Sequence, residues 1–438
     1  MSSTITATPE VDYASLAAVF QPVFDRIAVG ASKREQEHQL PYAEIRELTD
    51  AGFGALRVPI ADGGFGATLP QFFRLLTELA AADSNIPQAL RGHFAFVEDR
   101  LVSTGPQREV WLKRFVDGEI AGNAWTEVGT VKIGDVITKV SPIEGGTGDE
   151  FLVNGTKYYS TGSIFADWID TFAQRIEDDS LVIAVVNAHQ PGVTHRDDWD
   201  GFGQQTTGSG TSTFVNAVVK ADDVIDFETR FKYQTAFYQG VLLSVLAGSI
   251  KAAERDIAAE VRNRTRIFSH GNSDSFSTDP QILQVVGEVS AQAYAAEATV
   301  ERAAHALQGA YDAAFQGDEI EEERVNDLAE LETAQAQVVL TALATRATSD
   351  IFDALAASGV SVKKNLDRHW RNARTAANHN PWVFKARIVG DYVVNGATPP
   401  RVWSIGAGPD KNGQDKNGPD KNGPDRNGPD RKKLDKKE

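Results

Sequence analysis

The side chains that could carry out chemistry are few in this sequence, and the histidines are the most informative of them. Histidine titrates near neutral pH and is also the commonest metal ligand. The eight histidines stand at positions 38, 93, 189, 195, 270, 305, 369 and 379, and no two are four residues apart, as a pair of ligands on one helix would be. The histidines by themselves therefore predict no metal site.

Cysteine and the common phosphate-binding and nucleophile motifs are missing from the sequence. The absence of cysteine excludes disulfides, thiolate metal sites, iron–sulfur clusters and a cysteine nucleophile. There is also no Gly-x-x-x-x-Gly-Lys-Ser/Thr, no Gly-x-Gly-x-x-Gly after a strand, no His-Glu-x-x-His and no Gly-x-Ser-x-Gly. No local motif of these kinds assigns a reaction, so the elements that position the side chains have to be considered.

Length and charge limit the classes of protein. The 438 residues correspond to about three domain-sized units. With 44 Lys and Arg against 61 Asp and Glu, the net charge of -17 argues against nonspecific binding of nucleic acid or anionic membranes. No secretory signal is visible at the start. The longest strongly apolar stretch, near 241–247, is far shorter than the ~20 residues of a membrane helix. We therefore expect a cytoplasmic protein.

Hydrophobic spacing divides the chain into three folded regions. Helical spacing predicts an N-terminal helical domain over 1–118 and a C-terminal helical bundle over 226–400. Runs of β-branched residues bounded by turns predict a central antiparallel β domain over 119–225, with a tight turn at Asn154-Gly155. Asp279 followed by Pro280 predicts the start of one long helix, and the acidic segment Glu319–Glu323 predicts the start of another.

The segment 401–438 is a repeat rather than a folded region. The five residues from Gly408 to Asn412 recur with small changes up to Arg431. Almost no residue in it is apolar, and its glycines and prolines oppose regular structure. The composition predicts a disordered, solvated tail.

Three segments of the chain resemble the acyl-CoA dehydrogenase superfamily. The resemblance covers nearly the whole chain except the tail, and it implies a mostly helical, multi-domain α+β fold: helical N-domain, central antiparallel β domain and C-terminal helical bundle. The family usually forms tetramers through that bundle. The matching segments are Gly63-Gly64-Phe65-Gly66-Ala67, Ala124-Trp125-Thr126-Glu127 and the stretch from Asn154 to Gly162.

Two further stretches resemble one branch of that superfamily, the flavin-dependent monooxygenases typified by dibenzothiophene monooxygenase. These are residues 197–211 and 366–381. The resemblance implies a two-component enzyme that receives reduced FMN, or FADH2, from a separate NAD(P)H-dependent flavin reductase. With O2 it would oxygenate a small apolar sulfur- or nitrogen-containing substrate through a flavin C4a-hydroperoxide, which has to be kept dry and hydrogen-bonded.

The carboxylate base of an acyl-CoA dehydrogenase is missing where the resemblance would place it. Such an enzyme needs this base to remove a proton beside the thioester. The usual glutamate position falls at Asn380, and the alternative position falls near Thr235 or Ala236. This favours the oxygenase. An acyl-CoA dehydrogenase or oxidase with its base elsewhere is the first alternative, and a non-catalytic flavin-fold binding protein is the second.

The resemblance also implies roles for individual residues. His379 matches a histidine beside the flavin C4a edge, where it could donate to the peroxide and relay a proton at neutral pH; the alternative is a helix-capping or inter-subunit histidine. Thr161 matches a hydroxyl near flavin N5, and the alternative is an ordinary strand threonine. The remaining contacts expected for the cofactor, each of which could instead be structural, are Thr126, Tyr159, Ser160, Ser209 and Asn380.

The expected phosphate and substrate contacts come from other parts of the chain. Arg266 matches the arginine that grips the flavin phosphate, with Arg264 as its competitor. His93 matches a histidine of the substrate pocket, although a lone histidine is more often a satisfied polar residue. Trp199 would line the same pocket or be a buried structural residue. The segment 271–275 is expected to be a mobile loop near the phosphate. Val128 departs from the family pattern, where an asparagine is usual.

Overall fold

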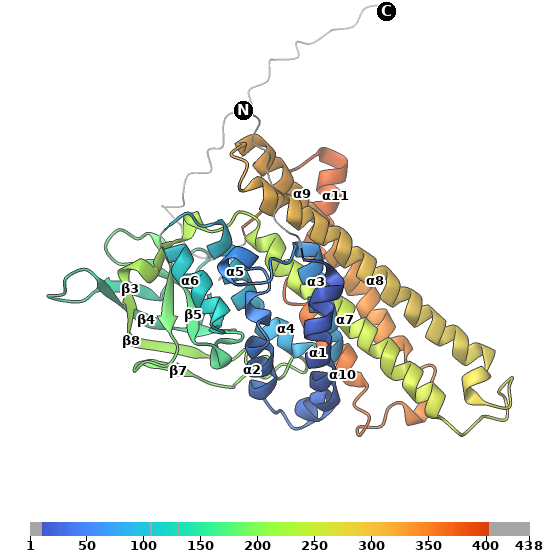
Figure 1. The fold of residues 1–438 in the computed structure, drawn as a ribbon. Coiled ribbons are helices and arrows are strands. Elements are labelled where there is room, and N and C mark those ends of the chain that lie inside the picture. Colours follow the sequence, from blue (N-terminus) through green and yellow to red (C-terminus); the bar gives the residue numbers. More distant parts are fainter. Residues whose placement is uncertain (1–10, 106, 130, 403–438) are drawn as a thin grey trace, which may run out of the picture.

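The computed structural model describes residues 11–105, 107–129 and 131–402, and Figure 1 shows its elements in chain order. Except for Arg401 and Val402, the predicted tail over 401–438 lies outside the described residues. Helices form both ends of the described chain, and a sheet lies between them along the sequence.

The N-terminal region is a group of helices whose apolar faces share one core. Asp12 caps the first helix by accepting a hydrogen bond from the Ser15 N–H, and Thr68 and Gln71 form a capping box at the start of the third. A cluster of phenylalanines, including Phe53 and Phe72, packs edge to face inside. The helices are α1 (Tyr13–Gln36), α2 (Tyr42–Asp50), α3 (Leu69–Ala82), α4 (Asn85–Ala89), α5 (Arg91–Val102) and α6 (Gln107–Val116).

The central region is a single curled sheet of nine strands with the order β7-β8-β4-β3-β5-β6-β9, in which β1 pairs with β5 and β2 with β4. The expectation of a purely antiparallel domain is wrong for two pairs, because β1 and β3 both run parallel to β5. The strands are β1 (Ala121–Ala124), β2 (Thr126–Glu127), β3 (Lys139–Pro142), β4 (Glu150–Tyr158), β5 (Trp168–Arg175), β6 (Leu181–Asn187), β7 (Val193–His195), β8 (Ser212–Lys220) and β9 (Val224–Asp226).

The Asn154-Gly155 turn prediction is wrong. Strand β4 continues through both residues, with a register shift against β8 between Val153 and Gly155. A Cβ at Gly155 would lie 2.4 Å from Thr138 Oγ1, so glycine serves a close approach inside the sheet. Asn154 Oδ1 accepts the Asn216 backbone N–H at 2.8 Å beside the irregularity. The dipeptide therefore marks a bulge, which local composition does not distinguish from a hairpin turn.

Long helices form the C-terminal bundle, seen at the right of Figure 1. They are α7 (Gln234–Asn263), α8 (Pro280–Ala313), α9 (Glu319–Asp350), α10 (Asp367–Ala377) and α11 (Trp382–Asn395). The predicted starts are confirmed: Asp279 caps α8 through the Gln281 and Ile282 N–H groups, and Asp318 caps α9. Buried alanines along α8 and α9 let these two helices pack closely.

Helix α7 is the core element that joins the regions. By length and composition it could cross a membrane, but 89% of its apolar window is buried inside the protein, as in a core helix. Its residues pack in one apolar cluster with α3 of the N-terminal region and α8 and α9 of the bundle. The start of α7 also meets the sheet, where the rings of Tyr238 and Trp125 lie 5.7 Å apart. The corner between sheet and helices is therefore fixed by buried contacts.

Candidate functional site

His379 stands in the turn after α10 and contacts Arg91 at the start of α5. Its Nε2 lies 2.9 Å from Arg91 Nη2. A guanidinium can only donate hydrogen bonds, so Nε2 is the acceptor and the proton of the neutral imidazole is on Nδ1. The ring keeps exposed surface. His379 thus presents one N–H donor while its other nitrogen is held by a cation.

The same contact sets the charge of His379. Burial and the neighbouring Arg91 guanidinium lower the pKa of His379 to about 3. Water at its exposed surface offsets part of this effect, but a cation 2.9 Å away opposes protonation whatever the exposure. His379 is therefore neutral at pH 7. It can donate a hydrogen bond but does not carry the extra proton that the predicted proton relay needs.

Asn380 fixes this turn to two helices of the bundle. Its Nδ2 donates to Gln239 Oε1 on α7 at 3.0 Å, and its backbone oxygen accepts from Gln337 Nε2 on α9 at 2.8 Å. Asn380 thus has an amide at the position where a dehydrogenase would have its carboxylate base. The contacts with Gln239 and Gln337 hold the turn in place. Asn380 therefore positions His379, its neighbour in the chain.

Thr161 lies in the loop after β4 and is 2% exposed. Its hydroxyl is 2.8 Å from Ser209 Oγ, which in turn is 2.7 Å from Thr207 Oγ1. Thr207 donates to the backbone oxygen of Gln204, so the chain of hydroxyls ends on a fixed acceptor. The Ser209 hydroxyl thus supports Thr161, and a phosphate contact by this turn stays a prediction.

Asn123 on β1 connects the Thr161 loop to the His379 side of the site. Its backbone N–H donates to Thr161 O at 3.4 Å, and a Cβ at Gly92, next to Arg91, would lie 2.9 Å from its side chain. Its Oδ1 is buried and has no hydrogen-bond partner among the described residues. Asn123 belongs to none of the motifs named in the sequence analysis. The available signal was an asparagine inside an otherwise small-residue strand, Ala121 to Ala124.

Other buried polar atoms near Asn123 also have no partner within the described residues. Arg91 Nε and the hydroxyl of Tyr238 are both unpaired, and the Arg91 guanidinium lies 5.0 Å above the Tyr238 ring. Unpaired buried polar groups are costly and rare in folded proteins. Their concentration beside exposed His379 indicates a place where a polar molecule from outside the chain binds.

The expected aromatic contacts lie at the edge of this region. Tyr159 has a positive φ of 59° and is 48% exposed, with its ring 4.6 Å from Tyr158 and 5.9 Å from Trp199. Trp199 donates to Gly203 O and is partly buried. Thr126 is also partly buried and pairs with Tyr158 across β2 and β4. The strained backbone at Tyr159 turns its ring outward, where a ligand could contact it.

Ser160 is committed to the fold of the loop. Its hydroxyl donates to Gly210 O at 2.7 Å and accepts from Ser212 Oγ, which is itself 2.8 Å from His195 Nδ1. The Ser160 N–H donates to the same Gly210 oxygen. The hydroxyl of Ser160 is therefore used in holding the loop against the segment at the start of β8.

The expectation that His93 lines a substrate pocket is wrong. His93 is fully buried, its Nε2 donates to Gly54 O at 2.9 Å, and its Nδ1 accepts the Ala121 N–H at 3.2 Å. Both ring nitrogens are thus used, and the ring packs on Phe115. Burial lowers the pKa of His93 to about 4. This histidine joins the N-terminal helices to β1, two positions from the arginine that does contact His379.

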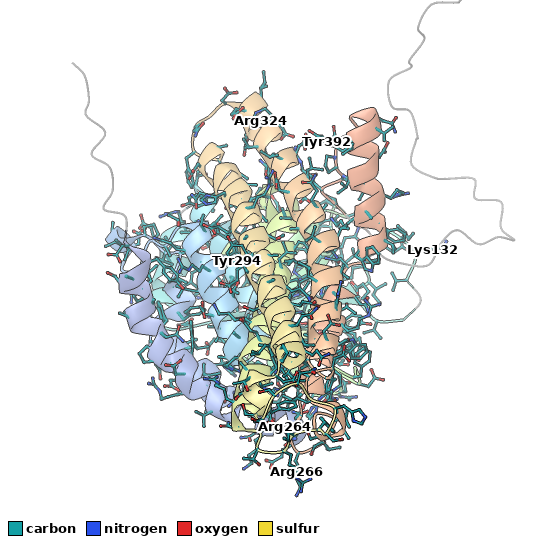
Figure 2. All side chains as sticks on the ribbon, turned by 90° about the vertical axis from the view of Figure 1, so that its right-hand side faces the viewer. Lys132, Arg264, Arg266, Tyr294, Arg324 and Tyr392 are labelled. Atoms are coloured by element: carbon teal, nitrogen blue, oxygen red, sulfur yellow. The ribbon has the colours of Figure 1, made fainter. Side chains whose placement is uncertain are left out.

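Arg266 lies far from His379 within one chain. Gln239, which holds Asn380, is 24 residues before the end of α7 at Asn263, about 36 Å along the helix axis. Figure 2 shows Arg264 and Arg266 together at one end of the bundle, with Arg324 and Tyr392 at the other. Arg264 donates to Leu355 O and Ser358 Oγ, whereas Arg266 is exposed.

A cavity of about 240 Å³ lies in the part of the chain that follows Arg266. It is lined by residues of the segment between α7 and α8, among them Phe268, Gly271 and Ser275. The predicted loop 271–275 therefore lines a cavity, and its nearness to a flavin phosphate stays a prediction. Its mobility stays a prediction, and the side chain of Asp279 ties it to α8 by accepting the Asn272 N–H at 2.8 Å.

Glu330 on α9 is the carboxylate to weigh as an alternative base. It is 1% exposed and accepts a hydrogen bond from the Ala236 backbone N–H, and its Oε1 has no hydrogen-bond partner in the described part of the chain. Burial raises the pKa of Glu330 to about 7, against the effect of Lys385. Glu330 caps the first turn of α7, about 10 Å along α9 from Gln337. It belongs to a different helix from either family position of the base.

Replacing Glu330 by glutamine should change the pH dependence of stability. The pKa of Glu330 is higher in the folded chain than the ordinary value of 4.5, so wild type loses stability as pH rises from about 4.5 to about 7. Relative to wild type, Glu330→Gln should gain up to about 1.4 kcal/mol per pH unit across that window in urea unfolding. The control is Glu288→Gln, which removes an exposed carboxylate on α8. Parallel pH curves for wild type and Glu330→Gln would contradict the prediction.

Sequence comparison matches both helical regions to one family. The acyl-CoA dehydrogenase N-terminal domain matches residues 15–119, and the acyl-CoA dehydrogenase C-terminal domain matches residues 243–383. Together the two matches include more than half of the 438 residues. They cover the N-terminal helices and most of the bundle.

Two relatives that cover most of this chain are named monooxygenases. Dibenzothiophene monooxygenase of Rhodococcus erythropolis is 26% identical over 403 residues, covering 87% of this chain and 94% of that protein. The probable FMNH2-dependent monooxygenase SfnC of Pseudomonas putida is 25% identical over 395 residues, covering 87% and 95%. The crystal structure of FMN-bound TdsC from Paenibacillus sp. A11-2 has a TM-score of 0.78 at 25% identity, covering 88% of this chain and 98% of TdsC.

Proposed function

The chain belongs to the acyl-CoA dehydrogenase superfamily, which confirms the predicted fold class. From its similarity to named monooxygenases and from the residues at the site, we propose that it is a two-component flavin-dependent monooxygenase. It takes reduced FMN from a separate NAD(P)H-dependent flavin reductase and uses O2 to oxygenate a small sulfur- or nitrogen-containing substrate. The observation that carries the proposal is the neutral His379–Asn380 pair where a dehydrogenase would have its carboxylate.

The residues at the site fit a flavin. The edge of a flavin ring alternates donors and acceptors, and the unpaired Asn123 Oδ1 and Tyr238 hydroxyl offer an acceptor and a donor. We assign Thr161 and Asn123 to one side of the ring and His379 to the other, with Thr126 and Tyr159 as further contacts. Reduced FMN would supply the two electrons that reduce one oxygen atom of O2 to water while the other enters the substrate.

The chain's own groups would orient the reactants and control protons. His379 offers its Nδ1–H, held in that tautomer by Arg91, as a neutral donor over the ring. Asn380 holds the turn, and the Ser209–Thr207 relay fixes the direction of the Thr161 hydroxyl. His379, Asn380 and Thr161 do not have to remove a proton from carbon in this reaction. Their neutral groups suit oxygen transfer to a lone pair better than dehydrogenation.

The position of Arg266 requires a second copy of the chain if it binds the phosphate. About 36 Å of α7 separates it from the ring contacts, well beyond the length of one FMN molecule. We therefore propose a homotetramer in which Arg266 of one protomer reaches the flavin of another. We also propose that this homotetramer is cytoplasmic. Arg266 has no described side-chain partner of its own, which leaves it available for this contact.

Arg266→Ala should weaken FMN binding by about 10–100-fold, because a charge-assisted contact to phosphate is lost. Binding of riboflavin, which lacks the phosphate, should be unchanged in the same titration. The matched control is Arg262→Ala, since the Arg262 side chain donates to Ala258 O on its own helix. Equal weakening of FMN and riboflavin would remove Arg266 from the phosphate.

The function is tested by supplying photoreduced FMN and ¹⁸O2 with methyl phenyl sulfide as a probe. The expected product is the sulfoxide with one ¹⁸O atom, formed only when reduced flavin and protein are both present. Incubation with acyl-CoA and an electron acceptor tests the dehydrogenase alternative. Flavin reduction by acyl-CoA, without labelled sulfoxide, would overturn the proposal, and a failure to bind FMN would favour the non-catalytic alternative.

A further inference from the structure

Arg91 differs from the other buried arginines of the described chain. Arg34, Arg57, Arg100 and Arg230 each form an ion pair with a buried or nearly buried carboxylate. Arg91 is 6% exposed, and no carboxylate of the described residues lies within ion-pair distance of it. The fold thus pairs its buried guanidinium groups as a rule, and Arg91 is the exception.

The surroundings of Arg91 supply only neutral groups. Its Nη2 donates to His379 Nε2, its face lies over the Tyr238 ring, and its Nε has no partner. Burial lowers the pKa of Arg91 to about 10, so it is still charged at pH 7. A buried charge without an opposite charge is strongly destabilising. The aromatic and imidazole contacts of Arg91 stabilise its charge less than a carboxylate would. A purely structural role therefore does not explain the buried charge.

The place of Arg91 puts this charge next to the reacting atoms. Arg91 contacts exposed His379, and its neighbour Gly92 packs against Asn123, whose Oδ1 is also unpaired among the described residues. A guanidinium binds two oxygens of one oxyanion through its fork of N–H groups. A ligand that carries an oxyanion and binds beside His379 would stabilise the buried guanidinium.

We propose that Arg91 binds an oxyanion of the substrate, so that the site selects small organic acids, such as thioether carboxylates, over neutral compounds. This rests on the proposed monooxygenase function, whose reacting centre lies beside His379. It also changes the substrate class, from a purely apolar molecule to one with an anionic end and an oxidisable heteroatom. The reaction stays balanced: thioether, O2 and reduced FMN give sulfoxide, water and oxidised FMN.

Binding of two matched probes tests the proposal without turnover. (Phenylthio)acetate and its neutral amide have the same thioether and nearly the same shape. Isothermal titration of the protein loaded with oxidised FMN should show at least tenfold tighter binding of the carboxylate. In Arg91→Gln this preference should disappear, because the neutral side chain offers the carboxylate no opposite charge. Arg91→Lys, which keeps the charge but not the fork, should keep only part of the preference.

Controls separate this result from misfolding and from failure of the proposed function. Arg46→Gln removes an exposed arginine on α2 and should keep the full preference. A thermal melt identifies a variant that does not fold, and then Arg91→Lys carries the test. Equal binding of both probes by wild type would overturn the proposal, as would Arg91→Gln losing FMN affinity while keeping the preference, since Arg91 would then serve the flavin. Anion binding that depends on Arg91, without labelled sulfoxide, would refute the monooxygenase and leave the oxyanion site standing.

Discussion

Gly162→Ala is expected to destabilise the chain by about 3 kcal/mol or more and to weaken FMN binding. Gly162 has a φ of 77°, which costs an alanine about 1–2 kcal/mol. A Cβ there would also lie 1.9 Å from the backbone oxygen of Ala89, so either the loop or the α4–α5 corner has to move. The loop carries Thr161 and the corner carries Arg91, so both sides of the site shift apart.

The matched control for this prediction is Gly134→Ala. Gly134 has a φ of 92°, and a Cβ there meets nothing within 4 Å. It therefore carries the cost of the backbone conformation without the clash. In urea unfolding, the free energy of unfolding of Gly162→Ala should be about 1–3 kcal/mol lower than that of Gly134→Ala. Only Gly162→Ala should lose FMN affinity. Equal stabilities for the two variants would show that the loop does not press on Ala89.

His379→Ala is expected to uncouple flavin oxidation from product formation. The variant loses the Nδ1–H donor and leaves Arg91 without its acceptor. A missing hydrogen bond beside a buried charge costs about 1–3 kcal/mol, so product per reduced FMN consumed should fall roughly 10–100-fold. Hydrogen peroxide should rise to replace the lost product. The measurement is the ratio of sulfoxide to peroxide at equal flavin consumption.

Two comparisons make the His379 prediction specific. Asn378→Ala removes an exposed side chain in the same turn and should leave the ratio unchanged. Because the pKa of His379 is lowered to about 3, its neutral form persists from pH 5 to pH 8, so wild type should show no change in the ratio centred near pH 6.5. A step near pH 6.5 that vanishes in His379→Ala would show that the histidine does take up a proton there.

Particular residues show how far local sequence reasoning reaches. The start of α8 could be predicted because Asp279 and Pro280 act on backbone groups two or three residues away. Asn154-Gly155 could not, because its role depends on Thr138 in another strand. His93 and Arg91 are two residues apart, yet only Arg91 contacts His379. The direction in which α5 presents each side chain depends on β1 and the α10 turn, which are distant in sequence.

The sequence by itself determined the order of helical and β regions, the family, and the lack of a carboxylate at the expected base positions. These properties depend on local spacing and on residue identity. Only the tertiary structure showed that His379 is a neutral donor held by Arg91 and that both ring nitrogens of His93 bond to backbone groups in the core. It also showed that most of α7 separates Arg266 from the His379 turn. Charge state and availability are set by neighbours that folding brings together from segments as far apart as 91 and 379, and no local pattern records those contacts.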